Sequence, residues 1–398
     1  MEASGRSPSA ARRDYLLLIA TRIIRAFGFG FAGILVAVHL QARMFSPAEI
    51  GVALAIGLAT ASLSGLVSAS ASARFGRRRT LSALGVLMAV SGLDLALATQ
   101  HWLLILGGLT GMMGIAGTDN GPFLPVEQAM LTQAATRTNR NRAFARYSLT
   151  GALGAAAGAL VATVGTSPSR TTAFFIGFSL LGLLTAGIPL LVSSEVEAQP
   201  ARTFGTFKPL LGLGALFAVD SLGTGLVSTA VLVYWLTVRF GATPAVLGPA
   251  FGLMSLLVAL SFELSGRLAD RIGLVNTMVF THLPSNLLLL LVPFAPKIGF
   301  ALAILVIRST LVSMDQPARQ AYVVSIVPSN ERAGALAFTG AIRGLASAAG
   351  PVITGAAIQT ASFAFPFFTA GVLKAGYDVA LYFGFRRRRG DHEADGLL

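Results

Sequence analysis

The chain has 398 residues, of which 54% are hydrophobic and only 12% are charged, whereas soluble domains are about 25% charged. Together with a mean hydropathy of +0.72, this composition excludes an ordinary soluble protein and places most of the chain in lipid. Cysteine is absent, which excludes disulfides, thiolate metal sites and cysteine nucleophiles. The net charge of +13 is no sign of nucleic-acid binding, because the basic residues lie in short loops between apolar runs.

Apolar runs long enough to cross a bilayer recur along the whole chain, separated by loops that contain Arg, Asn, Pro or Ser. The first run is too long for a signal-peptide core, so we expect it to remain in the mature protein. The runs predict twelve transmembrane helices, at residues 15–40, 48–72, 80–99, 102–133, 142–165, 171–193, 209–238, 245–268, 273–295, 298–327, 332–359 and 364–385.

The loop charges predict the orientation of these helices. If the N-terminus is cytoplasmic, nineteen basic residues lie on the inner side and four on the outer side. The inner set is Arg6, Arg12, Arg13, Arg74, Arg77, Arg78, Arg79, Arg137, Arg140, Arg142, Arg202, Lys208, Arg267, Arg271, Arg332 and Arg386 to Arg389, and the outer set is Arg43, Arg170, Arg239 and Lys297. This bias predicts a multi-pass protein of the inner (plasma) membrane with both termini in the cytoplasm.

The two halves of the chain repeat one another. Arg25, Gly28 and Gly30 in the first span match Asp220, Gly223 and Gly225 in the seventh at an offset of 195, and Pro122 matches Pro317 at the same offset. The most polar connection falls between the halves. We therefore predict an N-terminal six-helix bundle (1–193), a cytoplasmic linker (194–208) and a C-terminal six-helix bundle with a basic tail (209–398).

Charges within the first and seventh spans predict a functional site, because a charge at bilayer depth costs about 2.5–3.5 kcal/mol on insertion scales. Arg22 and Arg25 share one face of the first span, and Asp220 occupies the repeat position of Arg25. We hypothesise that Arg25 and Asp220 lie near a central cavity, where they pair with each other or bind opposite charges of a substrate. The alternative is a structural ion pair that only fixes helix packing.

The fourth and tenth spans carry polar residues around prolines, which free backbone carbonyls for polar partners. The polar residues are Asp119, Asn120, Glu127 and Gln128 near Pro122 and Pro125, and Arg308, Asp315, Gln316, Arg319 and Gln320 near Pro317. Glu127 and Asp315 are the preferred contacts to the cavity, and Arg308 lies roughly on the face of Asp315. Arg319 and Gln320 are alternatively residues of the cytoplasmic helix end.

Further isolated charges are Asp94 in the third span, Glu263 in the eighth, Arg343 in the eleventh and Asp378 in the twelfth. A carboxylate in a low-dielectric setting exchanges a proton more readily near neutral pH, as coupling to a proton gradient requires. The coupling residues that we consider are Asp94, Glu127, Asp220 and Glu263; each is alternatively one partner of a static ion pair.

Residues 266–273 read Gly-Arg-Leu-Ala-Asp-Arg-Ile-Gly, which resembles the G-x-x-x-D-R-x-G loop signature of the major facilitator superfamily. The copy after the second span keeps Gly76 and Arg77 but has Ala73 where the family has Asp. The resemblance implies an all-α membrane protein with twelve transmembrane helices in two pseudo-symmetric six-helix bundles, monomeric in the usual case. It also implies a gating role for Gly266, Asp270, Arg271 and Gly273, with Gly76 and Arg77 as the degenerate copy.

Residues 121–131 and 314–324 also resemble a large group of bacterial members of this superfamily, among them drug-exporter-like permeases. No H-E-x-x-H, G-x-S-x-G or Walker sequence is present, so we expect neither an enzyme nor an ATP-driven pump, and no cofactor. We expect a secondary carrier that moves a small solute by alternating access, with the bilayer and protons as its other partners and no nucleic acid.

Proton-coupled export of a small organic compound by antiport is the first expectation for this carrier. The alternative is a carrier of organic anions or phosphate esters that uses Arg22, Arg25, Arg308 and Arg343, because guanidinium groups bind such anions in a bidentate manner. A metal-ion carrier and a non-transporting membrane receptor rank third and fourth.

Overall fold

The computed structural model describes residues 8–117, 121–134, 140–165, 167–194, 197, 210–327, 332–360 and 362–385, and these ranges contain helices and no strand. The helices of the first half are α1 (Pro8–Ala42), α2 (Pro47–Phe75), α3 (Arg77–Leu97), α4 (His101–Gly107), η1 (Gly108–Thr110), α5 (Phe123–Ala134), α6 (Arg140–Val161), η2 (Ala162–Val164), α7 (Pro168–Gly187) and η3 (Ile188–Leu191). Those of the second half are α8 (Leu211–Leu226), α9 (Thr229–Phe240), α10 (Pro244–Ile272), α11 (Leu274–Leu291), η6 (Val292–Phe294), α12 (Ile298–Ser309), α13 (Asp315–Ser325), α14 (Arg332–Gln359) and α15 (Phe365–Phe385).

Every one of the twelve predicted spans falls on one to three helical elements. Within the described ranges, nine helical segments are long and apolar enough to cross a membrane, and two shorter apolar helices, His101–Thr110 and Ile298–Ser309, accompany them. The prediction of an all-α membrane protein is confirmed.

The side-chain distribution is that of a protein solvated by lipid. Large apolar side chains such as Leu260 and Phe383 are 66% and 69% exposed, while Arg25, Asp220 and Lys374 are 0%, 1% and 2% exposed. Exposed apolar surface on this scale is rare in water-soluble proteins. The helices therefore turn their apolar faces to lipid and keep their charges inside.

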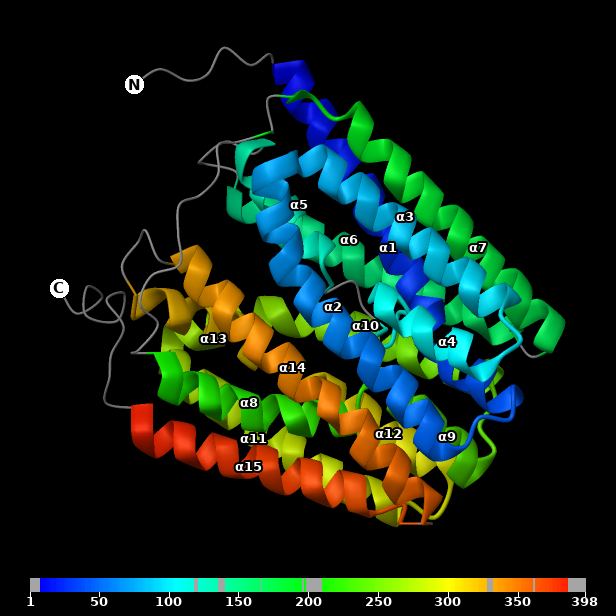
Figure 1. Cartoon of the computed structure of the whole chain (residues 1–398). Helices are drawn as coiled ribbons and strands as arrows, with labels where there is room; N and C mark the ends of the chain where they lie inside the picture. The colour runs from blue at the N-terminus through cyan, green and yellow to red at the C-terminus, as the bar shows by residue number, and fades with distance from the viewer. Residues whose placement is uncertain are drawn as a thin grey trace. The chain divides into compact units, whose positions relative to one another are not determined.

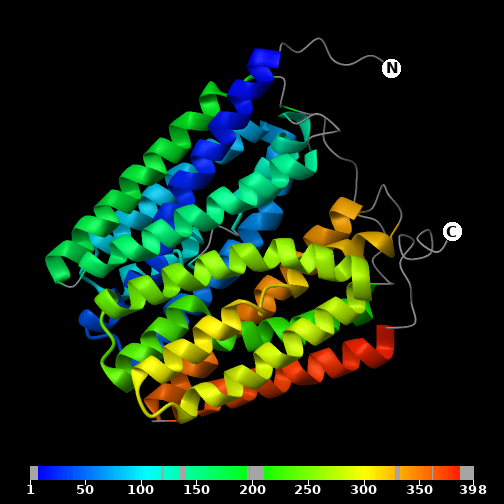
Figure 2. The ribbon, with the colours of Figure 1, turned by 180° about the vertical axis from the view of Figure 1, so that it is seen from behind.

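Contacts between helices divide the chain into two compact units. The first comprises Met1–Phe45, Ile56–Ala201 and Thr243–Gly252, and the second comprises Ser46–Ala55, Arg202–Ala242 and Leu253–Leu398. In the first unit α1 packs on α6 and α7 (Figure 2), and α3 packs on α7 (Figure 1). In the second unit α8 packs on α14 and α15, and α11 packs on α15 (Figure 1).

The same pairing of spans recurs in both units: first with fifth, third with sixth and first with sixth in one, and seventh with eleventh, ninth with twelfth and seventh with twelfth in the other. The repeat seen in the sequence is thus a repeat of packing. Two six-helix bundles of like construction follow from it.

Glycines at matched positions carry the closest helix contacts. A Cβ atom on Gly30 would collide with the carbonyl of Ala155 on α6, and a Cβ atom on Gly225 would collide with the carbonyl of Ser347 on α14. Both glycines are required because the backbones of two helices meet there without space for a side chain.

Gly76 and Gly273 begin α3 and α11 with φ values of 90° and 84°. Residues with side chains rarely adopt this conformation. Gly76 and Gly273, the last residues of the two copies of the loop signature, therefore adopt the same positive-φ conformation before α3 and α11.

Three predicted spans are interrupted. In the seventh, α8 ends at Leu226 and α9 begins at Thr229. The fourth stops after η1, where Gly111, Gly114 and Gly117 all have positive φ, and a helix resumes at Phe123. The tenth stops at Ser309, and a helix resumes at Asp315, with Pro317 in its first turn. Proline is accommodated in a first turn because the amides of that turn have no acceptor within the helix. The prolines that the repeat pairs thus accompany the restart of a helix in both halves.

Candidate functional site

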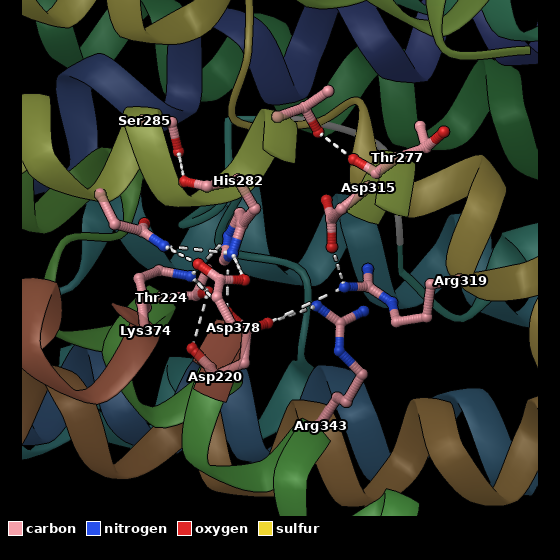
Figure 3. Close-up of polar contacts among 12 residues, drawn as sticks. Asp220, Thr224, Thr277, His282, Ser285, Asp315, Arg319, Arg343, Lys374 and Asp378 are labelled. Atoms are coloured by element: carbon pink, nitrogen blue, oxygen red, sulfur yellow. Dashed lines mark hydrogen bonds and ion pairs between the residues drawn. The ribbon is translucent and has the colours of Figure 1, made fainter. Parts of the chain in front are cut away.

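A network of polar side chains lies inside the second unit, and Figure 3 shows it in close-up. Its centre is Asp220, on the middle of α8. The Lys374 ammonium of α15 donates a hydrogen bond of 2.6 Å to Asp220 Oδ1 and another of 2.8 Å to Thr224 Oγ1, one turn further along α8. Asp220 and Lys374 are both almost fully buried, so each stabilises the charge of the other in a low-dielectric setting.

His282 of α11 joins Asp220 to a second carboxylate. Its Nε2 lies 3.6 Å from Asp220 Oδ1, and its Nδ1 lies 2.9 Å from Asp378 Oδ1. Asn286, one turn along α11, donates a 2.8 Å hydrogen bond to Asp378 Oδ2. Three titratable side chains from three helices are therefore linked in series: Asp220, His282 and Asp378.

Two arginines contact the other oxygen of Asp220. Arg343 Nη2 of α14 lies 3.5 Å from Asp220 Oδ2, and Arg319 Nη1 of α13 lies 3.8 Å from the same oxygen. Arg319 also forms an ion pair with Asp315, one turn earlier on its own helix. Arg308 of α12 is a further buried arginine of this unit, and its Nε has no hydrogen-bond partner among the described residues. Asp220 therefore balances several cations at once.

The first unit has its own buried ion pair. Arg25 of α1 donates hydrogen bonds of 2.6 and 2.5 Å to the two oxygens of Glu127 on α5. Thr21 and Tyr147 donate further hydrogen bonds to this carboxylate, of 3.0 and 2.5 Å. Arg22 lies over the ring of Tyr147, 4.8 Å from its centroid. Both oxygens of Glu127 are fully engaged, so the arrangement is a fixed bidentate pair.

Arg25 binds Glu127 and Asp220 binds Lys374; that Arg25 and Asp220 lie near a central cavity, where they pair or bind opposite charges of a substrate, stays a prediction. The repeat correctly identified equivalent positions. Each of these two charges has a partner within its own unit.

The other predicted coupling residues lie apart from the network. Asp94 of α3 is half-buried, and its Oδ2 packs against Gly107 without a hydrogen-bond partner in the described part of the chain. The Glu263 side chain is 72% exposed and pairs with Arg267 one turn later. Asp119 and Asn120 lie outside the described residues, and Gln320 is exposed.

The two copies of the loop signature differ in their contacts. Before α3, Glu197 accepts hydrogen bonds from the backbone amides of Arg77 (2.5 Å) and Arg78 (3.0 Å). The helix dipole favours a carboxylate at the N-terminus of α3. Glu197 therefore places a carboxylate beside this copy of the loop signature, in which Ala73 stands at the position of the family's Asp. Before α11, Asp270 and Arg271 are exposed, and Asp270 has no hydrogen bond or ion pair with another described residue. Gly266 has no neighbour within 4 Å of where a Cβ atom would stand.

The sequence interpretation missed Lys374 and His282. Lys374 lies within an apolar span, four residues before Asp378. A charged residue in such a span indicates a functional site, so Lys374 could have been predicted on the same ground as Asp378. His282 carried no comparable signal, because histidine is uncharged at neutral pH by default and only the fold brings it between two aspartates.

The network can hold and pass protons, because it links two carboxylates through an imidazole whose two ring nitrogens can each bind a proton. It can also bind a charged solute, because several cations share one aspartate. Among the described residues no group of three or more His, Cys, Asp or Glu side chains is placed to hold a metal ion.

Apolar membrane helices in two units of like packing, with charges linked across helices inside one of them, are those of a secondary transporter rather than an enzyme. A family model of the Major Facilitator Superfamily matches residues 18–220 and again residues 213–396. The chain belongs to the Major Facilitator Superfamily.

Individual relatives agree with this assignment. An uncharacterized membrane protein of Saccharomyces cerevisiae is 22% identical over 393 residues, which cover 87% of this chain and 88% of the yeast protein. The crystal structure of the nucleoside transporter NupG matches with a TM-score of 0.69 and 16% identity, over 94% of this chain and 98% of that one. The D-xylose-proton symporter matches with a TM-score of 0.72 and 16% identity, over 92% and 97%. At such identities the solved structures establish the shared fold.

Proposed function

We propose that this protein is a proton-coupled carrier that exports a small organic compound across the inner (plasma) membrane, as a monomer with both termini in the cytoplasm. The observation that carries the proposal is the series Asp220, His282 and Asp378, linked to Lys374 inside the second unit. The proposed organisation is a six-helix bundle over 1–193, a linker over 194–208 and a second bundle over 209–398.

The coupling follows from the charge on Asp220. When Asp220 is ionised, its attraction for Lys374 holds α8 against α15. When a proton neutralises the carboxylate, the attraction is lost, and the ammonium is left buried without a counter-ion, which is costly. The helices then repack, and the carrier changes the side from which its site is reached. His282 delivers or accepts the proton because it lies between the two aspartates.

A proton-linked relative of the same fold, the D-xylose-proton symporter, supports coupling of this kind. Export is supported by the likeness of residues 121–131 and 314–324 to drug-exporter-like permeases. Within the set Asp94, Glu127, Asp220 and Glu263, the contacts favour Asp220: Glu127 is held by Arg25 on both oxygens, and Glu263 is exposed.

Transport in proteoliposomes tests the coupling, using a solute first identified by a thermal-shift screen of the purified protein. An Asp220→Asn variant should still exchange solute across the membrane but lose accumulation driven by a pH gradient, because it no longer binds the coupling proton. Glu263→Gln, which removes an exposed carboxylate of the same unit, should accumulate solute like the unaltered protein. Gradient-driven accumulation that survives in Asp220→Asn would rule out Asp220 as the coupling residue.

A further inference from the structure

Within the described part of the chain, Arg308 is a buried cation without a counter-ion. It is 8% exposed, and its guanidinium forms no hydrogen bond or ion pair with any residue that the structure describes; its Nε in particular is buried without a partner. An unpaired charge at this depth is strongly disfavoured. A guanidinium has five N–H donors, so the side chain has an unused capacity to bind an anion.

Arg343 has a similar unused capacity. Its one ionic contact, to Asp220 Oδ2, is long at 3.5 Å, and its Nε is buried without a hydrogen-bond partner in the described part of the chain. Its side chain is 27% exposed, whereas those of Lys374 and Arg319 are 3% and 5% exposed. Arg343 is thus the cation of the network that a solute reaches most easily.

The remaining charges of the network are already matched. Lys374 pairs with Asp220, and Arg319 pairs with Asp315. Asp378 is held by His282 and Asn286. With all three carboxylates ionised and His282 neutral, the four buried basic residues of this unit (Arg308, Arg319, Arg343 and Lys374) outnumber its three buried carboxylates (Asp220, Asp315 and Asp378) by one positive charge.

We infer that Arg343, the most exposed cation of the network, recognises the single carboxylate group of a small organic substrate, and that buried Arg308 supplies the positive charge that this carboxylate compensates. The inference rests on the proposed carrier function and names its substrate class. A carboxylate supplies one negative charge, which matches the one surplus positive charge. A phosphate ester carries nearly two negative charges at neutral pH and would leave the network with an uncompensated anion. Carboxylate and guanidinium also match in geometry, because both are planar and bind through two parallel hydrogen bonds.

Binding of a carboxylate by Arg343 also changes the surroundings of Asp220, the proposed coupling residue. A carboxylate that attracts Arg343 competes with Asp220 for the same guanidinium. Asp220 then loses one of the cations that keep it ionised, so substrate and proton influence each other through Arg343. This is a direct electrostatic route from solute binding to proton uptake or release.

Matched pairs of an acid and its amide test the charge requirement. The full-length protein, purified in lipid nanodiscs, is melted with benzoate or benzamide, with acetate or acetamide, and with phenyl phosphate, all at one ionic strength. We expect at least one carboxylate to raise the melting temperature, while its amide and phenyl phosphate leave the temperature unchanged. The apparent affinity for that carboxylate should fall at least about tenfold in Arg308→Gln and in Arg343→Gln.

Arg267→Gln is the matched control, because Arg267 belongs to the same unit but is exposed and pairs with Glu263; it should bind the carboxylate like the unaltered protein. Three results would overturn the inference: equal shifts from acid and amide, no shift from any carboxylate tested, or a shift that survives in both Arg308→Gln and Arg343→Gln. Proton coupling through Asp220 is measured separately, by accumulation in proteoliposomes. A carrier that accumulates an uncharged solute would therefore contradict the carboxylate site and leave the coupling intact.

Discussion

At the scale of single residues, the buried arginines of this protein fall into two kinds. Arg25 is held by both oxygens of Glu127 and lies against the ring of Phe123, 4.2 Å from its centroid. Arg308 is buried to a similar degree, but no described residue neutralises it. The Arg25–Glu127 pair stabilises its bundle without a ligand. Arg308 stabilises its bundle only when a bound ligand supplies a negative charge.

This difference predicts opposite effects of the same substitution. Arg25→Met should destabilise the protein by about 3–5 kcal/mol, because it leaves the Glu127 carboxylate buried without its cation. Arg308→Met should leave the stability unchanged or raise it, because it replaces an unpaired buried charge with an apolar side chain. Thermal melting of the purified variants without added ligand measures both effects.

A double variant, Arg25→Met with Glu127→Gln, controls for loss of packing and should recover part of the stability. If the melting temperature falls as far for Arg308→Met as for Arg25→Met, Arg308 has a structural partner and is not an unpaired charge that awaits a ligand.

The buried charges themselves were visible in the sequence. Each of them lies in an apolar run, where a charged residue is unusual. They are Arg25, Glu127, Asp220, Arg308, Asp315, Arg343 and Asp378. Their partners were not visible, because contacts within a bundle join helices that lie far apart in the chain. Asp220 and Lys374 are 154 residues apart, and Arg25 and Glu127 are 102 residues apart. Pairing therefore required the fold.

At the scale of elements, contacts between helices are set by small residues at matched places in the repeat. Thr354 of α14 adds a hydrogen bond of 2.8 Å to the carbonyl of Leu226 at the end of α8. Gly225 meets the Ser347 carbonyl of α14, and Gly350 meets the backbone of Gly225 in return. The glycine-rich faces were evident in the sequence, but which helix each face contacts was not.

Gly225→Leu tests this contact. The added side chain has no space against the α14 backbone, so we expect a destabilisation of about 1–3 kcal/mol or more from overpacking. Gly212→Leu on the same helix is the matched control, because nothing lies within 4 Å of where its Cβ atom would stand. That substitution should be neutral or gain up to about 0.8 kcal/mol from the higher helix propensity of leucine. Thermal melting compares the two variants, and equal effects would contradict the close approach.

The interruptions within the fourth and tenth spans show the limit of a prediction based on hydropathy. Residues 102–133 and 298–327 are apolar enough to suggest one continuous helix each. The three positive-φ glycines at 111, 114 and 117 end the first of these helices early. In the tenth span the interruption moves Asp315 onto the same short helix as Arg319, with which it pairs, and away from the helix that carries Arg308.

At the scale of the whole molecule, the fold followed from simple properties of the sequence: apolar run lengths, charges in loops and a repeat offset near 195 residues. These properties arise from the bilayer, which forces each span to satisfy its own backbone. The substrate does not follow from them, because the same fold serves nucleoside and xylose transporters among the structures it resembles. We expect the charge network of the second unit to select the substrate of this carrier.

Alternating access is the central claim, and side-specific labelling of one cysteine tests it most directly. The chain has no native cysteine, so Thr224→Cys introduces a single thiol. Thr224 is exposed, and its hydroxyl accepts a hydrogen bond from Lys374, beside Asp220. A membrane-impermeant thiol reagent should label this cysteine from either side of the membrane, and a shift in pH should favour one side at the expense of the other. Labelling from one side only, at every pH, would contradict a carrier that exposes its site to both sides in turn.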